Sequence, residues 1–112
     1  MQPKLLKYIL DIESIVSEIE EIKLRINNNF DAYKADFVVQ RAIERDLEII
    51  GEAVKKLLEL DNSIEISFSK RIIGLRNIIS HAYDTVEPEL IWGIIQKDIP
   101  VLYQEIQAIK NG

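Results

Sequence analysis

Residues 36–60 read DFVVQRAIERDLEIIGEAVKKLLEL, and this stretch decides the fold class. Its apolar residues recur at intervals of three and four, at Val39, Ile43, Leu47, Ile50, Val54, Leu57 and Leu58. This spacing gathers them on one face of an α-helix, whereas a β-strand would repeat every second residue. The run Asp61-Asn62-Ser63 that follows is typical of a helix end. We therefore predict an amphipathic helix that opens near Asp36 and runs to about Leu60.

Three further segments carry the same helical period. The first begins at Pro3, which suits a first helical turn, and ends at Asn27-Asn28-Asn29, because Asn tolerates left-handed backbone. The third covers roughly residues 68–82, with Ser67 or Ser69 as its candidate N-cap. The last starts around Pro88 and continues to the C-terminus, with an expected kink or break at Pro100.

These segments predict an all-α fold, an antiparallel up-and-down bundle of four to five helices. The length of 112 residues suits one domain, and we expect a single helical domain over residues 1–112. A hydrophobic content of 47% is sufficient for a packed core and argues against intrinsic disorder. Few prolines, glycines and aromatic residues disfavour an all-β fold.

Composition also limits the function classes. The chain has no cysteine, which excludes disulfides, thiolate metal sites and a cysteine nucleophile. Its single histidine rules out a multi-His metal site within one chain. No window is long and apolar enough for a membrane span, and we expect a cytoplasmic protein with no bound cofactor. A net charge of −5 disfavours generic binding to nucleic acid, so any polynucleotide chemistry must rest on a local patch.

Gly51 is an unusual residue for the middle of the predicted helix over residues 36–60. Glycine in a helix interior costs about 1 kcal/mol relative to alanine. Either another backbone or a ligand approaches closely at this position, or the glycine is simply tolerated.

Residues 67–83 form a segment of 17 residues without any Asp or Glu. Lys70, Arg71 and Arg76 give it a charge of +3 in a chain of −5. Such an asymmetry favours a local anion site. A mostly buried helix would also lack acidic residues, and the charge alone leaves both interpretations open.

Within this segment, Asn77 and His81 are four residues apart and share one helix face, and Arg76 lies beside that face. His81 falls near the expected helix C-terminus, where the helix dipole favours an imidazolium. Arginine can bind phosphate oxygens, histidine can transfer protons and asparagine can orient either one, so the set suits phosphoryl chemistry. The alternative is a histidine with a purely structural role.

The string Arg76-x4-His81-x-Tyr83 resembles the signature of HEPN-domain proteins, in their HepT-like toxin branch. Further stretches resemble that branch in register across nearly the whole chain. They read LKYILDI over residues 6–12, LEIIGEA over 47–53, IIGLRN over 72–77 and LIW over 90–92.

The resemblance implies a metal-independent endoribonuclease toxin of a type VII-like toxin–antitoxin system, with transfer RNA as the expected substrate. It implies a homodimer whose active centre lies between the two protomers, with Arg76 and His81 catalytic and Asn77 supporting them. The partner would be a minimal nucleotidyltransferase (MntA-like) antitoxin. Tyr83 would be the residue to which that partner attaches AMP; otherwise Tyr83 packs its ring against the helix end.

The chemistry agrees with a dimer. RNA cleavage by the 2′-hydroxyl requires one group to remove a proton and another to supply one, and each chain has one histidine. A twofold dimer would bring two copies of His81 and two of Arg76 to one cleft. Trp92 is expected in the core or at this dimer interface.

Two other classes of function stay open, a non-catalytic HEPN module that binds a nucleotide or a nucleotidyltransferase, and a plain helical dimerisation domain. Lys70, Arg71 and Arg45 are weaker candidates for RNA binding. Arg45 could instead pair, like Arg41, with nearby acidic residues. Glu52 either contacts the motif and orients Arg76 or lies on a solvated face.

Overall fold

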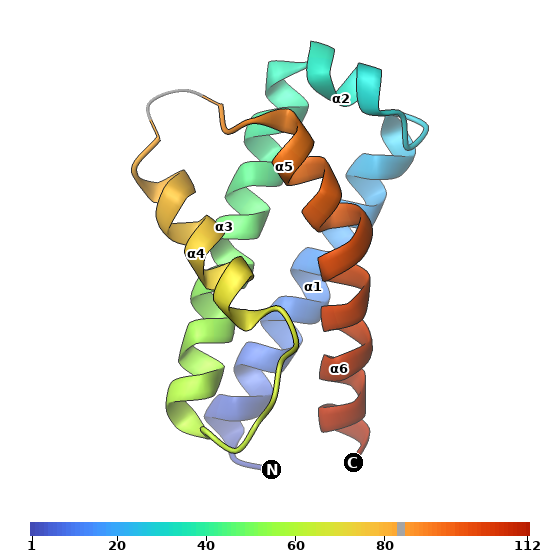
Figure 1. Ribbon diagram of the computed structural model, residues 1–112. Coiled ribbons are helices and arrows are strands. Elements are labelled where there is room, and N and C mark those ends of the chain that lie inside the picture. Colours follow the sequence, from blue (N-terminus) through green and yellow to red (C-terminus); the bar gives the residue numbers. More distant parts are fainter. Residues whose placement is uncertain (83–84) are drawn as a thin grey trace.

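The computed structural model describes residues 1–82 and 85–112, and every regular element within these ranges is helical (Figure 1). The fold is all-α, as predicted. The elements follow in the order α1 (Pro3–Arg25), α2 (Phe30–Ala35), α3 (Phe37–Leu60), α4 (Ser69–Ser80), α5 (Pro88–Gly93), a π-helical turn (Ile94–Asp98) and α6 (Ile99–Asn111).

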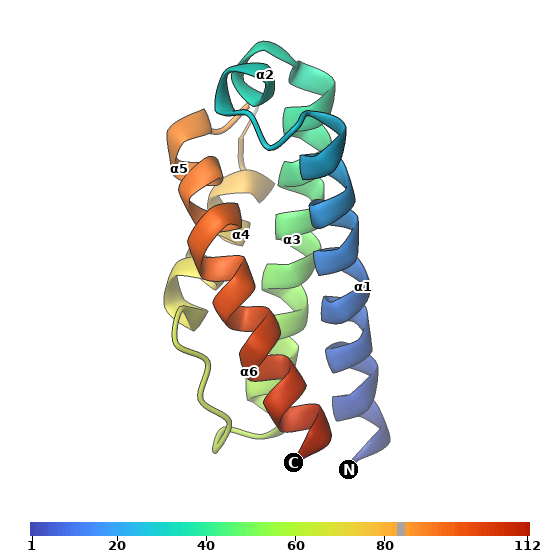
Figure 2. The same ribbon diagram turned by 90° about the vertical axis from the view of Figure 1, so that its right-hand side faces the viewer.

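The long helices alternate in direction. α1 runs away from the end of the bundle that holds both termini, α3 returns towards it, α4 runs away again, and α5 with α6 leads back (Figure 1). Figure 2 shows α1, α3 and α6 side by side along the length of the molecule. The up-and-down arrangement is therefore confirmed.

The core is built almost entirely from aliphatic side chains on the inward faces of the helices. The fully buried ones, with no exposed surface, are Ile9, Ile12, Ile19, Ile43, Ile50, Val54, Leu57, Ile91, Ile94, Ile95, Ile99, Leu102 and Ile106. Each such side chain contributes about 1.5–3 kcal/mol when it leaves water. Most of the stripe predicted for residues 36–60 is thus buried, and only Val39 and Leu58 of that stripe are partly exposed.

Short polar residues set the helix boundaries near the first turn of the chain. Asn27 and Asn28 adopt left-handed backbone with φ of 55° and 49°, and this ends α1 where the sequence predicted. The Asn29 side chain then accepts a hydrogen bond from the Ala32 N–H and caps α2. The Asp36 side chain caps α3 in the same way by accepting from Val38 and Val39.

The sequence analysis did not predict α2. This helix spans only Phe30–Ala35, which is too short to display a hydrophobic period. Its two aromatic rings, Phe30 and Tyr33, pack against the Trp92 ring of α5 at centroid distances of 5.7 and 5.5 Å. Trp92 therefore links α2 to α5 through ring contacts. It packs against the core, which was one of the two positions expected for it.

Two local predictions need correction: the last helical segment changes to a π turn just before Pro100 and is not broken there, and the N-cap predicted for α4 is wrong. Pro100 does not break the last helical segment, because the preceding turn widens to π geometry and the Ile99 N–H donates to the Ile94 carbonyl five residues back. The proline then lies within the first turn of α6, where no N–H is required. Neither Ser67 nor Ser69 caps α4, which begins after Phe68 without a side-chain cap. The Ser67 hydroxyl instead donates to Glu105 at 2.6 Å.

Candidate active site on helix α4

Helices α3 and α4 approach each other closely at Gly51. A Cβ atom at this position would lie 2.5 Å from the Cβ of Arg76 and 3.1 Å from the carbonyl oxygen of Ile72. Any side chain larger than hydrogen would force α4 outwards. Of the two interpretations of Gly51, close approach of another backbone is confirmed, and the residue it approaches is Arg76.

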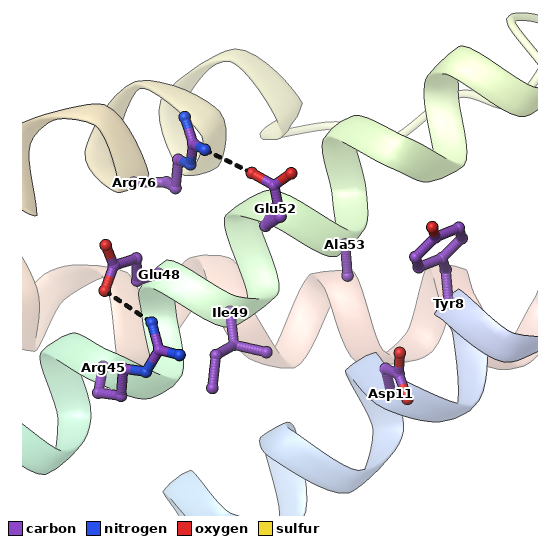
Figure 3. Close-up of a pocket in the computed structure, with 8 residues that line it drawn as sticks. All are labelled: Tyr8, Asp11, Arg45, Glu48, Ile49, Glu52, Ala53 and Arg76. Atoms are coloured by element: carbon purple, nitrogen blue, oxygen red, sulfur yellow. Dashed lines mark hydrogen bonds and ion pairs between the residues drawn. The ribbon is translucent and has the colours of Figure 1, made fainter. Parts of the chain in front are cut away.

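Arg76 makes two charge-assisted contacts. Its Nη2 lies 2.6 Å from Oε2 of Glu52 on α3 (Figure 3), and its Nη1 donates to Oδ1 of Asn77 at 2.8 Å. The Arg76 side chain is 29% exposed, so the two contacts orient it without removing it from solvent. Glu52 contacts the motif, which was one of the two alternatives that the sequence left open. Asn77 accepts a hydrogen bond from Arg76, and its supporting role in catalysis stays a prediction.

A second contact between the same two helices lies one turn away. Glu48 precedes Glu52 by one turn of α3, and its Oε2 accepts a hydrogen bond from the Ser80 hydroxyl of α4 at 2.7 Å. The other oxygen of Glu48 accepts from Arg45 at 3.1 Å. The hydrogen bond from Ser80, aided by the charges of Arg45 and Arg76, lowers the pKa of Glu48 below its ordinary value. Glu48 is therefore an ionised acceptor at neutral pH.

His81 caps the C-terminal end of α4. Its side chain is exposed, and its backbone N–H donates to the Ile78 and Ile79 carbonyls that close the helix. The expected position near the helix C-terminus is confirmed. Arg76 and His81 are separated by five residues, which corresponds to about 7.5 Å along the helix axis. Tyr83, the predicted site of AMP attachment, lies outside the described residues.

The three weaker RNA-binding candidates do not gather in one place. Arg45 pairs with Glu48, which was the alternative reading of this residue, and it faces the same cavity as Arg76. Lys70 and Arg71 line a different cavity of about 260 Å³, between α4 and α5. Arg71 is also held at 3.0 Å from the carboxylate of Asp98, which is fully buried. Of the three, only Arg45 thus extends the surface around Arg76.

A cavity of about 280 Å³ opens beside Arg76, and we call it the Arg76 pocket (Figure 3). It lies along α3, with α1 on one side and α4 on the other. Its lining consists of Tyr8, Asp11, Arg45, Glu48, Ile49, Glu52, Ala53 and Arg76. The sequence analysis did not single out Tyr8 or Asp11 for this site, because only the packing of α1 on α3 brings them to it.

Over residues 1–82 and 85–112, no three or more His, Cys, Asp or Glu side chains come together in a way that could hold a metal ion. In the same ranges, none of the helices combines the length and the apolar character that crossing a membrane requires.

The structure is a helical bundle that carries Arg76, Asn77 and His81 towards the end of α4. Comparison of the sequence with known protein families identifies the class to which it belongs. The model of the family described as "Ribonuclease HepT-like" matches residues 12–109, which is most of the chain. The chain belongs to this family. Its class of function is accordingly that of an endoribonuclease.

Individual relatives cover nearly the same length. The chain is 36% identical over 101 residues to "Putative RNase TTE0752" of Caldanaerobacter subterraneus subsp. tengcongensis, covering 88% of this chain and 89% of that protein. It is 30% identical over 105 residues to "Probable ribonuclease HepT" of Thermococcus cleftensis, covering 93% and 94% of the two chains. No solved structure matches the chain significantly.

Proposed function

We propose that this chain is the toxin of a type VII-like toxin–antitoxin pair and cleaves RNA in the cytoplasm as a homodimer, without a metal ion. One observation carries the proposal. The Arg76 guanidinium is oriented by Glu52 and Asn77 and stays partly exposed, on the same helix whose end presents His81. A fixed cation and an imidazole, which can both accept and donate a proton, are the two groups that phosphoryl transfer of this kind needs.

In the proposed reaction, the ribose 2′-hydroxyl attacks the adjacent phosphorus and the bond from phosphorus to the 5′-oxygen breaks. The products are a 2′,3′-cyclic phosphate and a 5′-hydroxyl. One His81 removes the proton from the 2′-hydroxyl, and the partner's His81 gives a proton to the departing 5′-oxygen. Arg76 stabilises the negative charge that builds up on the phosphate oxygens, and Asn77 keeps Arg76 in position.

Transfer RNA is the proposed substrate, and a minimal nucleotidyltransferase is the proposed antitoxin. In the neutralising step, the phenolic oxygen of Tyr83 attacks the α-phosphate of ATP, an AMP group becomes attached and pyrophosphate leaves. The added phosphate is negatively charged and close in sequence to Arg76 and His81, so it would repel an RNA phosphate from the site.

The first test is induced expression in a bacterial host of the wild type, His81→Ala and the surface control Lys55→Ala. We expect the wild type and the control to arrest growth and to leave cleaved transfer RNA, whereas His81→Ala does neither. Purified protein should cut the RNA in the presence of EDTA and leave cyclic phosphate ends. Intact RNA in cells that contain folded wild-type protein would contradict the proposal and favour the non-catalytic binding module.

The composite site requires its own test, with dimers that contain one wild-type and one His81→Ala chain. If each protomer cuts RNA independently, such mixed dimers keep about half of the activity. If both histidines serve one cleft, the activity is almost completely lost, and this is the outcome we expect.

A further inference from the structure

The Arg76 pocket contains more than the cleavage chemistry requires, and this surplus suggests how the protein selects its RNA. Only Arg76, at one edge, belongs to the reacting set. The rest of the lining combines an aromatic ring, two apolar side chains, three carboxylates and a second arginine, which belong to Tyr8, Ile49, Ala53, Asp11, Glu48, Glu52 and Arg45. A phosphate group would gain nothing from an aromatic ring and several carboxylates, so the pocket suits a different part of the RNA.

The carboxylates are acceptors held in fixed places. Oε2 of Glu52 is bound to Arg76, and the second oxygen of Glu52 points away from that arginine (Figure 3). Oδ2 of Asp11 pairs with Lys7 at 2.8 Å, which leaves Asp11 a second oxygen as well. Ionised carboxylates only accept hydrogen bonds, so their partner in the ligand must present hydrogen-bond donors, which in a nucleobase are its N–H groups.

The cations stand around the edge of the pocket. Arg76 lies on the α4 side, Arg45 lies one turn from Ile49 on α3, and the Lys7 ammonium lies 5.1 Å from the centre of the Tyr8 ring on α1. An RNA strand needs such an arrangement, because phosphates flank every base on both sides. Proteins commonly bind an unstacked base against apolar and aromatic side chains of this kind.

We propose that the Arg76 pocket binds an unpaired guanine base next to the phosphate that is cut. The base would lie against Tyr8, Ile49 and Ala53, while its N2–H group donates to Asp11 and its N1–H group donates to Glu52. Guanine is favoured because it is the only one of the four RNA bases with two adjacent N–H donor groups on its Watson–Crick edge. The assignment of the neighbouring phosphate to Arg76 rests on the proposed ribonuclease function.

Nucleotide binding tests the pocket separately from catalysis. Purified His81→Ala protein, which keeps the pocket, is titrated calorimetrically with GMP, IMP, AMP, CMP and UMP. We expect GMP to bind about tenfold more tightly than IMP, which lacks the N2 amino group that donates to a charged acceptor. Tyr8→Ala, made in the same background, should weaken GMP binding about tenfold, and Tyr8→Phe should restore most of it because the ring returns.

Asp11→Asn should remove the preference for GMP over IMP, while the surface variant Lys55→Ala keeps it. Melting curves identify any variant that fails to fold, and the two Tyr8 variants and Asp11→Asn test the pocket from different sides. Equal binding of all five nucleotides, or tighter binding of AMP, would overturn the assignment of guanine.

Cleavage provides the second readout. The wild type digests a mixture of unstructured oligoribonucleotides, and the ends are sequenced. A guanosine at one fixed position beside the cut, replaced by mixed bases in Asp11→Asn, supports the pocket. Cuts without any base preference would overturn it and leave the ribonuclease proposal standing. If RNA stays intact, the ribonuclease proposal is wrong, and the nucleotide titration still decides the pocket.

Discussion

The two arginines of α4 that form ion pairs, Arg71 and Arg76, lie five residues apart and have different surroundings. Arg71 pairs with Asp98 of the π-helical turn at 3.0 Å, and that carboxylate has no exposed surface. Arg76 pairs with Glu52 of α3 at 2.6 Å, and the Glu52 side chain is 41% exposed. One pair joins α4 to the interior of the bundle, and the other lies at the edge of a cavity open to solvent.

The burial of the carboxylate decides what each pair does. Loss of solvation raises the pKa of Asp98 above its ordinary value, and the charge of Arg71 opposes this shift. A buried carboxylate without its cation is strongly unfavourable, so Arg71 is needed to hold the π turn in place. A partly exposed pair such as Arg76–Glu52 contributes little to stability. It fixes the direction of a guanidinium and leaves it accessible to a ligand.

The largest expected effects separate these two arginines. Arg76→Ala should reduce RNA cleavage about 100- to 1,000-fold, the typical loss when a group that stabilises a charged transition state is removed, with little change in melting temperature. Arg71→Ala should lower the free energy of unfolding by about 3 kcal/mol and keep most of the cleavage activity of the folded protein. Thermal melting and single-turnover cleavage measure the two effects.

The double variant Arg71→Ala, Asp98→Asn provides the control for this comparison. The neutral amide removes the unpaired charge, so we expect it to recover much of the lost stability at neutral pH. No recovery would mean that the packing of the Arg71 side chain, and not its charge, supports the π turn. A loss of cleavage in Arg71→Ala equal to that in Arg76→Ala would break the distinction between the two arginines.

Two glycines compare the side of α4 that packs closely on α3 with the side that has free space around it. Gly51→Ala should destabilise the protein by about 1–3 kcal/mol and reduce cleavage, because the new Cβ would meet Arg76 at 2.5 Å. Gly74→Ala is the matched control, since no atom lies within 4 Å of a Cβ there. It should stabilise α4 by up to about 1 kcal/mol. Chemical denaturation measures both; a stabilised Gly51→Ala would show that the helices are not in close contact.

The carboxyl group of Asp46 lies near another carboxyl group, whereas those of Asp98 and Glu52 pair with arginines. Burial, and then the neighbouring Glu18 of α1, raise its pKa from 3.8 to about 7. The folded protein therefore holds more protons than the unfolded chain between about pH 4 and pH 7, and stability falls as the pH rises through this window. Asp46→Asn should remove most of this fall, with a higher melting temperature than the wild type at pH 8 and a similar one at pH 4.

The smallest expected effect concerns the hydrogen bond between Ser80 and Glu48. Ser80→Ala should cost about 1 kcal/mol at pH 7. Because the pKa of Glu48 is lowered in the folded protein, the stability it provides is present above its ordinary value of 4.5 and is lost as the pH falls through the folded pKa. The difference between wild type and variant should therefore shrink in acid. A difference independent of pH would point to lost packing.

The sequence was sufficient wherever a property repeats along a helix. The stripe that includes Ile43, Ile50 and Leu57 is buried as predicted, and Asn27 and Asn28 end α1 as predicted. Arg76, Asn77 and His81 could be grouped because they share the end of one helix, where spacing fixes relative position. Short or compensated features could not be predicted in this way: α2 is too brief to show a period, and the π turn absorbs Pro100.

The sequence by itself determined the helical class, the interior faces and the family, because these depend on local spacing and on residue type. The tertiary structure alone decided what surrounds Arg76. Gly51 permits the approach of α4 to α3, Glu52 then comes to 2.6 Å from the guanidinium, and α1 brings Tyr8 to the same pocket from more than forty residues away in the chain. Contacts between helices depend on how the helices cross, and no periodicity within one segment specifies that crossing.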